Sequence, residues 1–337
     1  MKAYTSNNIR NIAVLGHGGK GKTTLCEAML YIAGASDRLG RVADGNTVLD
    51  FDSEEKRRKS SVSSAIAALE WDNTKLNIID APGLFDFEGG AAEAVRAAEA
   101  VLIVTSAGSG VDVGTEKAFR AAEKKGAAKF FAITKTDSDH RNFYKTFDAL
   151  KEVYGNKLCP TIIPYMEGNI TKCYVNLMTG MAFSYDENGK ATKVPVPEDS
   201  VIEEMTSAFM EAVATTDDAL MEKFFEGEKF TKEEILKGLC IGIFDGSIYP
   251  VYAVSGLTCA GVDQLLYGLA WSAPGAFGYA GEKCTYENGE EGILPCDENG
   301  PLAAVCFKTI ADPFVGKMSF FKVVSGKLAP DTAAYNF

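Results

Sequence analysis

The sequence predicts an α/β fold in which helices cover both faces of a doubly wound, mostly parallel sheet. Short apolar runs typical of strands alternate with stretches of helical periodicity from residue 11 onward. Polar, glycine-containing motifs directly follow several of these runs. Because a doubly wound sheet binds its ligands outside the carboxyl ends of the strands, we expect these motifs to lie together at one edge of the sheet.

The first elements are a strand over residues 11–15 and a helix over residues 22–33, in which apolar side chains recur on one face. Residues 64–71 and 75–80 have the pattern of two strands joined by a short turn. The alternation continues with helices over residues 91–98, 115–125 and 142–153 and with apolar, strand-like runs over residues 101–106, 130–134 and 251–254. His140 lies just before the last helix and is expected to cap it.

The composition excludes several classes of protein. No apolar run approaches the ~20 residues of a membrane helix, and the first residues lack the apolar stretch of a secretion signal, so we expect a cytoplasmic protein without membrane contact. The net charge of −12 argues against indiscriminate binding to nucleic acid, and no direct DNA contact is expected. Eight cysteines without a C-x-x-C pair and only two histidines argue against a zinc site and favour free thiols.

The first motif reads LGHGGKGKTT over residues 15–24 and fits the phosphate-loop pattern G-x-x-x-x-G-K-[ST]. Glycines let successive backbone N–H groups turn toward an anion, and the following helix adds its positive N-terminus. The Lys22 ammonium can reach the β- and γ-phosphates of a nucleotide, and the Thr23 hydroxyl can bind Mg²⁺. An ordinary glycine-rich turn is the alternative. We expect nucleotide contacts from Gly18, Gly19, Lys20, Gly21, Lys22, Thr23 and Thr24.

The second motif is DAPG, residues 80–83, at the end of the strand over residues 75–80. A carboxylate at Asp80 can hold Mg²⁺ through water, and the Gly83 N–H can meet a γ-phosphate. By itself this motif is compatible with a plain turn. Its position behind a phosphate loop favours the functional interpretation.

The third and fourth motifs predict recognition of a guanine base. In TKTD, residues 134–137, the Asp137 carboxylate can accept both the N1–H and the exocyclic amine of guanine, a donor pair that adenine lacks. Lys135 can lay its alkyl stem along the base. Backbone N–H groups of residues 255–257, which read SGL, can meet the guanine O6. Each of these two motifs is weak on its own.

These four motifs, in this order, resemble those of the GTPase domain of translational GTPases, with the greatest likeness to elongation factor G and the ribosomal protection proteins. Residues 50–71 resemble the family's first switch, and residues 76–87 resemble its second switch. GVDVGTEKAFRAA and PVYAVSGLTCAGVDQLL continue the match. Residues 311–328 resemble the opening of the family's second domain, a β-barrel, so the likeness covers nearly the whole chain.

The resemblance implies an enzyme that hydrolyses GTP to GDP and phosphate and couples this reaction to a conformational switch on the ribosome, working as a monomer. It implies Mg²⁺ bound by Thr23 and Ser61 and supported by Asp80. The residues expected to take part in catalysis are Lys22, Thr23, Asp80 and Gly83. Those expected to bind the base are Thr134, Lys135, Asp137, Ser255, Gly256 and Leu257.

Several positions depart from the family pattern. Leu84 stands where the family has a histidine that orients the attacking water, and the loss of such a group typically costs ~10²–10⁴ in rate. Ser61 replaces a threonine but keeps the hydroxyl. Thr134 replaces an asparagine of the guanine motif, which should weaken base binding. Gly19 replaces an aspartate and Lys20 an alanine. We therefore expect nucleotide binding and a working switch with slow intrinsic hydrolysis.

Two other functions stay open. Leu84 also fits a binding module that holds GTP or GDP and signals without useful turnover. An ATP-using phosphate-loop enzyme is disfavoured by Asp137, but Thr134 keeps it open.

A chain of 337 residues exceeds one typical domain. We expect a GTPase domain over residues 1–280, with an inserted α+β subdomain at about residues 156–247, and an incomplete β-barrel over residues 281–337. The insert should contain strands near residues 161–163 and 173–177, a turn at residues 187–189, and then helices. The last part ends in a strand pattern at residues 332–335 and is too short to close a barrel, so we expect a piece of a longer protein.

Other noticeable residues are expected to be structural. His17 should belong to the structure of its loop, and the basic run at residues 57–59 is expected to be a solvated loop rather than a partner contact. Four aromatic residues near the switches are expected to pack in the core rather than stack on a base: Phe51, Trp71, Phe85 and Phe87.

Overall fold

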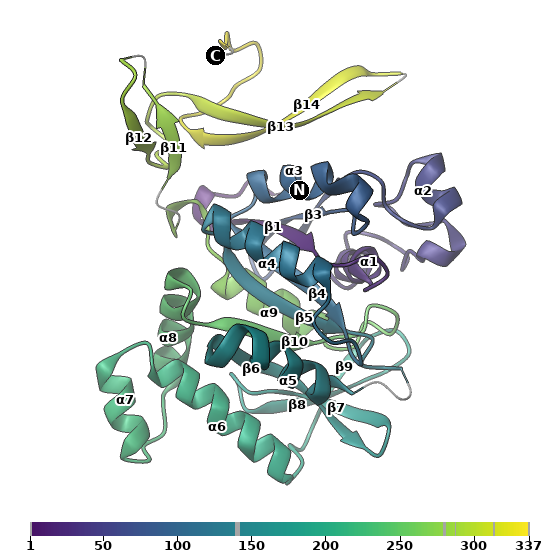
Figure 1. Cartoon of the computed structure of the whole chain (residues 1–337), viewed down its shortest axis with the longest axis vertical. Coiled ribbons are helices and arrows are strands. Elements are labelled where there is room, and N and C mark those ends of the chain that lie inside the picture. Colours follow the sequence, from purple (N-terminus) through teal and green to yellow (C-terminus); the bar gives the residue numbers. More distant parts are fainter. Residues whose placement is uncertain (1, 139–141, 279–280, 287, 313, 336–337) are drawn as a thin grey trace.

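The computed structural model describes residues 2–138, 142–278, 281–286, 288–312 and 314–335. Within these residues ten strands form one sheet in the order β2-β3-β1-β4-β5-β10-β6-β7-β8-β9 (Figure 1). Helices lie on both faces of the sheet, and two antiparallel hairpins follow it in the chain. The prediction of a doubly wound, mostly parallel α/β fold is confirmed.

The centre of the sheet is parallel and buried. β1 (Ile9–Leu15) lies between β3 (Thr74–Asp80) and β4 (Ala100–Ser106), and the three strands run in the same direction. β5 (Ala128–Thr134) and β10 (Tyr249–Ala253) continue the parallel arrangement beyond β4. All residues of β4, β5 and β10 are buried, because helices cover both faces, and this explains why their sequences are mostly apolar.

Two layers of helices enclose this central sheet. β2 (Ala65–Trp71) pairs antiparallel with β3, and α1 (Lys22–Ile32) and α9 (Val262–Ser272) pack together against these two strands. On the other face, nearer the viewer in Figure 1, α3 (Glu88–Ala97) and α4 (Val113–Lys125) pack together over β1 and β4. The predicted strands and helices of this region are thus present, with ends that differ by a few residues.

The helix predicted over residues 142–153 is α5 (Phe143–Tyr154), which packs against β5. Its N-cap is Asn142, whose side-chain oxygen accepts a hydrogen bond of 3.2 Å from the Lys145 N–H. His140, which we expected to cap this helix, lies outside the described residues. In the part of the chain that the structure describes, none of the helices is both long and apolar enough to cross a membrane.

The predicted insert extends the main sheet. β6 (Leu158–Glu167) lies parallel to β10, and β7 (Ile170–Asn176), β8 (Met181–Tyr185) and β9 (Ala191–Val194) follow as an antiparallel meander. The strands expected near residues 161–163 and 173–177 and the turn at residues 187–189 are confirmed. The helices that follow are α6 (Ser200–Ala214), α7 (Asp218–Phe225) and α8 (Lys232–Asp245). The domain limits themselves stay a prediction.

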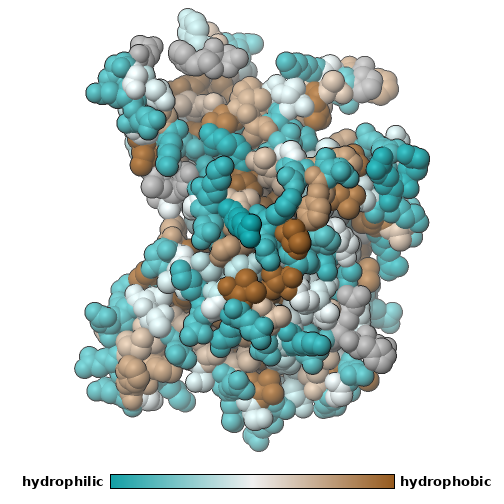
Figure 2. Space-filling view, in the orientation of Figure 1, coloured by the Kyte–Doolittle hydropathy of each residue, from teal (hydrophilic) through white to brown (hydrophobic). Residues whose placement is uncertain are grey.

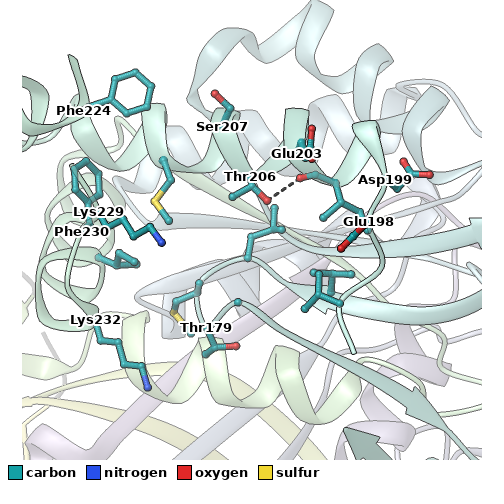
Figure 3. Close-up of a pocket in the computed structure, with 18 of the residues that line it drawn as sticks. Thr179, Glu198, Asp199, Glu203, Thr206, Ser207, Phe224, Lys229, Phe230 and Lys232 are labelled. Atoms are coloured by element: carbon teal, nitrogen blue, oxygen red, sulfur yellow. Dashed lines mark hydrogen bonds between the residues drawn. The ribbon is translucent and has the colours of Figure 1, made fainter. Parts of the chain in front are cut away.

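The inserted subdomain contains a cavity of about 1000 Å³ between β7, α6 and the start of α8 (Figure 3). Its wall is mostly apolar, and β7 contributes Val175 while Leu177 follows directly. Because side chains alternate along a strand, Tyr174 and Asn176 point to the opposite face. Charged side chains stand at its two ends, with Glu198, Asp199 and Glu203 on one side and Lys229 and Lys232 on the other.

The last described residues form two separate hairpins. β11 (Glu282–Thr285) pairs with β12 (Glu291–Leu294), and β13 (Ala303–Asp312) pairs with β14 (Gly316–Ser325). The strand predicted over residues 332–335 is wrong: this segment is not part of a strand. The Thr332 hydroxyl instead donates to the Ala329 carbonyl at 2.7 Å and closes a turn around Pro330.

A buried ionic cluster joins the hairpins to the main domain. The Glu282 carboxylate accepts hydrogen bonds from Arg96 at 2.8 Å and Lys125 at 2.9 Å, and the Lys322 ammonium lies 3.6 Å away. Lys322 also pairs with Glu99. Burial by itself would raise the pKa of Glu282, but the hydrogen bond and charge of Lys125 and the charges of Lys322 and Arg96 outweigh it and hold this pKa below its ordinary value.

We predict that Glu282→Gln lowers the free energy of unfolding by about 3 kcal/mol, because it removes the carboxylate that binds Arg96 and the buried Lys125 and leaves Lys322 with Glu99 as its remaining carboxylate. The measurement is urea denaturation at pH 7. Since the folded-state pKa of Glu282 is depressed, the loss should be complete above the ordinary glutamate pKa of ~4.3 and should shrink as the pH falls through the folded-state value.

The matched control is Glu116→Gln, which removes an exposed i,i+4 pair with Arg120 on α4 and should change stability by less than about 0.5 kcal/mol. If both variants lowered the free energy of unfolding by the same small amount, the buried cluster would not stabilise the fold as proposed.

Candidate functional site

The four sequence motifs lie at one edge of the sheet, because each follows the carboxyl end of a parallel strand. The loop after β1 contains the glycine-rich motif and the loop after β3 contains DAPG. TKTD begins at the last residue of β5, and SGL follows β10. Sequence reasoning therefore brought together the right loops, which come from four regions far apart in the chain.

The carbonyl groups of the glycine-rich loop accept hydrogen bonds from three side chains, which hold the loop in place. The Lys22 ammonium is buried and donates to the His17 carbonyl at 3.0 Å. The Thr134 hydroxyl lies 2.6 Å from the Lys20 carbonyl, and the Lys135 ammonium donates to the Gly19 carbonyl at 2.7 Å. These contacts leave the loop's carbonyls facing the TKTD motif, as expected for a loop whose N–H groups serve an anion.

The side chains of two residues that were predicted to bind the nucleotide, Lys20 and Thr134, are bonded to other parts of the protein. Lys20 forms an ion pair of 3.1 Å with Asp112, the N-cap of α4, so its side chain is occupied by that carboxylate. The Thr134 hydroxyl also lies 3.0 Å from the Thr105 carbonyl, so its one proton is shared between the carbonyls of Lys20 and Thr105, which links the glycine-rich loop to β4.

The residues predicted to hold a metal meet in the interior. The Thr23 hydroxyl donates to Asp80 Oδ2 at 2.6 Å and lies 3.0 Å from the Ser61 hydroxyl. All three side chains are buried. Asp50 is buried beside them, and its charge acts on that of Asp80. Sequence reasoning missed Asp50. Its only sequence signal was an acidic residue directly behind an apolar one in the segment that resembles the first switch.

The electrostatics of this cluster fit a divalent cation. Asp80 Oδ1 and both Asp50 oxygens are buried and have no hydrogen-bond partner among the described residues. Burial raises the pKa of Asp80 to about 7, against the opposing effects of the Thr23 hydrogen bond and the Lys22 charge. Burial also raises the pKa of Asp50, which the nearby Ser61 hydroxyl partly offsets. Buried carboxylate oxygens without partners are costly, and a hard cation would satisfy them.

No group of three or more His, Cys, Asp or Glu side chains suited to a metal occurs within the described ranges. The donor set is instead two carboxylates and two hydroxyls. Oxygen ligands of this kind, completed by water or phosphate, are what Mg²⁺ uses.

The DAPG motif lies directly against the glycine-rich loop. A Cβ atom on Gly83 would be 2.2 Å from Lys22 Nζ and 2.8 Å from the Gly18 N, so only glycine fits here. The next residue, Leu84, is 40% exposed, and its Cδ2 lies 3.1 Å from where a Gly18 Cβ would be. An apolar side chain therefore covers the glycine-rich loop at the position where the family resemblance expects a histidine.

The other two motifs form the far side of the site. Asp137 is exposed, as a base-contacting carboxylate must be before it binds. Ser255 is buried and its side-chain oxygen accepts from the Thr258 N–H at 3.2 Å, whereas Leu257 is 53% exposed. Gly256 approaches the start of α1, where an added Cβ would lie 3.0 Å from the Thr24 carbonyl.

The segment resembling the first switch is held by two buried glutamates that sequence reasoning missed. Glu55, in the short helix α2 (Ser53–Arg58), accepts hydrogen bonds from the N–H groups of Val62 at 3.0 Å and Ser63 at 3.2 Å. Glu27 on α1 accepts from the N–H groups of residues 48 and 49. The local D-x-x-E pattern of Asp52 and Glu55 marks a capping box at the start of α2, but it does not predict the bonds of Glu55 to residues 62 and 63. No local pattern marks Glu27, because it bonds a backbone more than twenty residues away.

The basic run at residues 57–59 is the exposed end of α2 rather than a loop. Arg57 and Arg58 both pair with Glu54 one turn earlier on the same helix. Figure 2 shows a hydrophilic surface over α2, which agrees with the expected solvation.

The aromatic residues divide into two groups. Phe51 is 57% exposed and Phe85 45% exposed, so the prediction that they pack in the core is wrong. Trp71 packs against the core as expected, and Phe87 is half-buried. Phe85 lies at the edge of the His17 ring, with centroids 5.5 Å apart, so these two residues support each other at the surface.

Comparison with known proteins gives consistent matches. A family model, the elongation factor Tu GTP binding domain, matches residues 7–274. An elongation factor G-like protein of Mycobacterium tuberculosis, found in strains CDC 1551 and H37Rv, is 33% identical over 331 residues, or 97% of this chain and 46% of that protein.

Among solved structures, a crystal structure of a protein from Thermus thermophilus matches with a TM-score of 0.83 and 33% identity, covering 96% of this chain and 46% of that chain. This chain therefore spans less than half the length of these relatives. The family model covers most of the chain, and the fold and motif order agree with it: this chain belongs to the translational GTPase family, and its relatives here are elongation factor G-like.

Proposed function

We propose that this chain binds GTP and GDP together with Mg²⁺, hydrolyses GTP slowly, and acts as the nucleotide-dependent switch of an elongation factor G-like protein. The observation that carries this proposal is the buried cluster of Thr23, Ser61, Asp80 and Asp50 beside the Lys22 ammonium. In such a cluster, three buried carboxylate oxygens lack hydrogen-bond partners among the described residues, and one cation is placed for phosphate, which fits the donor set of a nucleotide–Mg²⁺ site.

Each residue has a role in this proposal. Lys22 neutralises charge on the β- and γ-phosphates, and Thr23 and Ser61 are hydroxyl ligands of the metal with Asp80 and Asp50 behind them. The bound Mg²⁺ neutralises phosphate charge. The Gly83 N–H meets the γ-phosphate, so its loss on hydrolysis frees the second switch to move. Asp137 and Lys135 bind guanine, with the backbone of residues 255–257 on the base O6.

Slow hydrolysis follows from Leu84. Attack on the γ-phosphorus needs a water whose proton is accepted or oriented by a polar group, and leucine offers none. A second candidate function rests on the same residue: a guanine-nucleotide-binding module that signals without useful turnover. Single-turnover phosphate release from bound GTP, with and without ribosomes, separates the two.

The family relationship supports a ribosomal partner and a cytoplasmic location as proposals, since the curated relatives are elongation factor G-like proteins. That the chain works as a monomer stays a prediction. In the same sense we propose a GTPase domain over residues 1–280 and a second, barrel-like domain over residues 281–337. An ATP-using enzyme is the least favoured function, because Asp137 is exposed at the proposed base site.

We predict that Asp137→Asn lowers GDP affinity about 100-fold, because two charge-assisted hydrogen bonds of ~1.5 kcal/mol each are lost. The same variant should gain affinity for xanthosine diphosphate, whose C2 carbonyl accepts from the new amide. Equilibrium displacement of a fluorescent GDP analogue measures both. Unchanged GDP binding would show that Asp137 does not read the base.

We predict that Asp50→Asn weakens the Mg²⁺-dependent part of GTP binding about 10- to 100-fold and leaves binding in EDTA unchanged, because Asp50 supports the metal and not the base. Titration of Mg²⁺ against the GTP complex is the measurement. The control is Asp44→Asn at an exposed position. If the two variants had the same Mg²⁺ dependence of GTP binding, Asp50 would not support the metal.

We predict that Leu84→His raises the single-turnover rate of GTP hydrolysis by about 10² or more, because it restores a group that orients water. Leu84→Ala, which opens the site without adding a polar atom, should not. A histidine variant that binds GTP normally but hydrolyses it at the wild-type rate would contradict this explanation of slow turnover.

A further inference from the structure

The hydroxyl of Thr136, the residue between Lys135 and Asp137, takes part in two hydrogen bonds. Thr136 is buried, its hydroxyl lies 3.0 Å from the Val254 carbonyl, and it lies 2.7 Å from the hydroxyl of Tyr174 on β7. A threonine hydroxyl has one proton, and the Val254 carbonyl can only accept it. Tyr174 therefore donates to Thr136, which donates to Val254.

This chain of bonds connects three separate parts of the molecule. Thr136 belongs to the TKTD motif, Val254 directly precedes the SGL motif, and Tyr174 comes from the inserted subdomain. A second residue of β7 acts on the same point, since the Thr171 hydroxyl donates to the Thr136 carbonyl at 2.8 Å. That carbonyl is part of the peptide that leads into Asp137, so β7 fixes the backbone orientation of the base-reading carboxylate.

The inserted subdomain also holds the segment after the SGL motif. The Tyr185 hydroxyl donates to Asp263 at 2.6 Å, and the Asn176 amide donates to Gln264 at 2.8 Å. The rings of Tyr174 and Tyr185 meet edge to face with centroids 5.5 Å apart. Side chains of β7 and β8 thus hold the TKTD motif and the first turn of α9, the helix that follows the SGL motif.

Tyr174 is suited to a fixed role. It is 4% exposed, and burial raises the pKa of its hydroxyl, so it stays a neutral donor. The departure at Thr134 makes such support more important. An asparagine there would offer an amide to the site, whereas the Thr134 hydroxyl is committed to the carbonyls of Lys20 and Thr105. The orientation of Asp137 then depends on the residue directly before it, Thr136.

We propose that the inserted subdomain sets the guanine selectivity of this site, with Tyr174 as a positioning residue that acts on Asp137 through Thr136. The inference rests on the proposed function, because it concerns how the base is read. It assigns to the insert a role in nucleotide recognition in addition to extending the sheet.

The test compares Tyr174→Phe with wild type by displacement of a fluorescent GDP analogue with GDP and with inosine diphosphate. Inosine lacks the exocyclic amine, so it can use only one of the two Asp137 hydrogen bonds. We expect Tyr174→Phe to lower GDP affinity roughly tenfold, which corresponds to one hydrogen bond, and to lower inosine diphosphate affinity less. The preference for GDP should therefore shrink.

The matched control is Tyr144→Phe. Tyr144 on α5 donates to the Pro164 carbonyl at 2.6 Å, and Pro164 is the residue of β6 that pairs with Tyr174. This variant therefore deletes a similar hydroxyl bond in the same part of the sheet, but one that does not involve Thr136. It should keep both affinities. Thr136→Val should reproduce the effect of Tyr174→Phe and add little to it in the double variant, since the two act through one bond, whereas Thr136→Ser should retain binding.

The possible results distinguish a failure of the proposed nucleotide binding from a failure of the proposed role of Tyr174. If the wild-type protein does not bind GDP, both the proposed function and the role of Tyr174 are contradicted. If wild type binds GDP but Tyr174→Phe keeps its affinity and its preference over inosine diphosphate, the inference alone is overturned. A uniform loss for both nucleotides, with a melting temperature lowered as in Tyr144→Phe, would show a merely structural role and would also overturn it.

Discussion

The site depends on the hydrogen bond that joins Thr23 to Asp80, because it closes the glycine-rich loop onto the end of β3. Around this bond the fold buries two carboxylates, two hydroxyls and the Lys22 ammonium in a region where water cannot satisfy them. Buried carboxylates without partners lower stability, so their retention is best explained by a cation and an anion that complete the set. The parallel sheet makes this possible, since β1 and β3 are neighbours that end at the same edge.

Local patterns were enough to predict the sheet, the helices and the four loops. Continuous apolar runs mark buried parallel strands, and glycines mark the close approaches, as at Gly83 beside Lys22. What sequence reasoning missed is non-local. Asp50 and Glu27 act on residues that only the folded chain brings near, and the exposed Phe51 and Phe85 are residue types that are usually buried. The strand predicted at residues 332–335 failed because a Thr332 turn competes with it.

The parts beyond the central sheet are attached by polar contacts as well as by packing. The inserted subdomain adds strands to the sheet, bonds the TKTD motif through Thr171 and Tyr174, and bonds the start of α9 through Tyr185. The C-terminal hairpins dock through the Glu282 cluster. They also dock through Lys308, which donates to the Ser64 hydroxyl at 2.9 Å, within the segment that resembles the first switch. Both neighbouring parts thus contact segments that border the proposed nucleotide site.

The most direct measurement is displacement of a fluorescent GDP analogue from the purified chain by GDP, GTP and ATP in the presence of Mg²⁺. Tight displacement by GDP and GTP, with ATP ineffective, is the predicted result, because we propose that the exposed Asp137 accepts two hydrogen bonds that guanine donates and adenine cannot. Displacement by ATP as strong as by GDP, or no binding of the analogue, would contradict it.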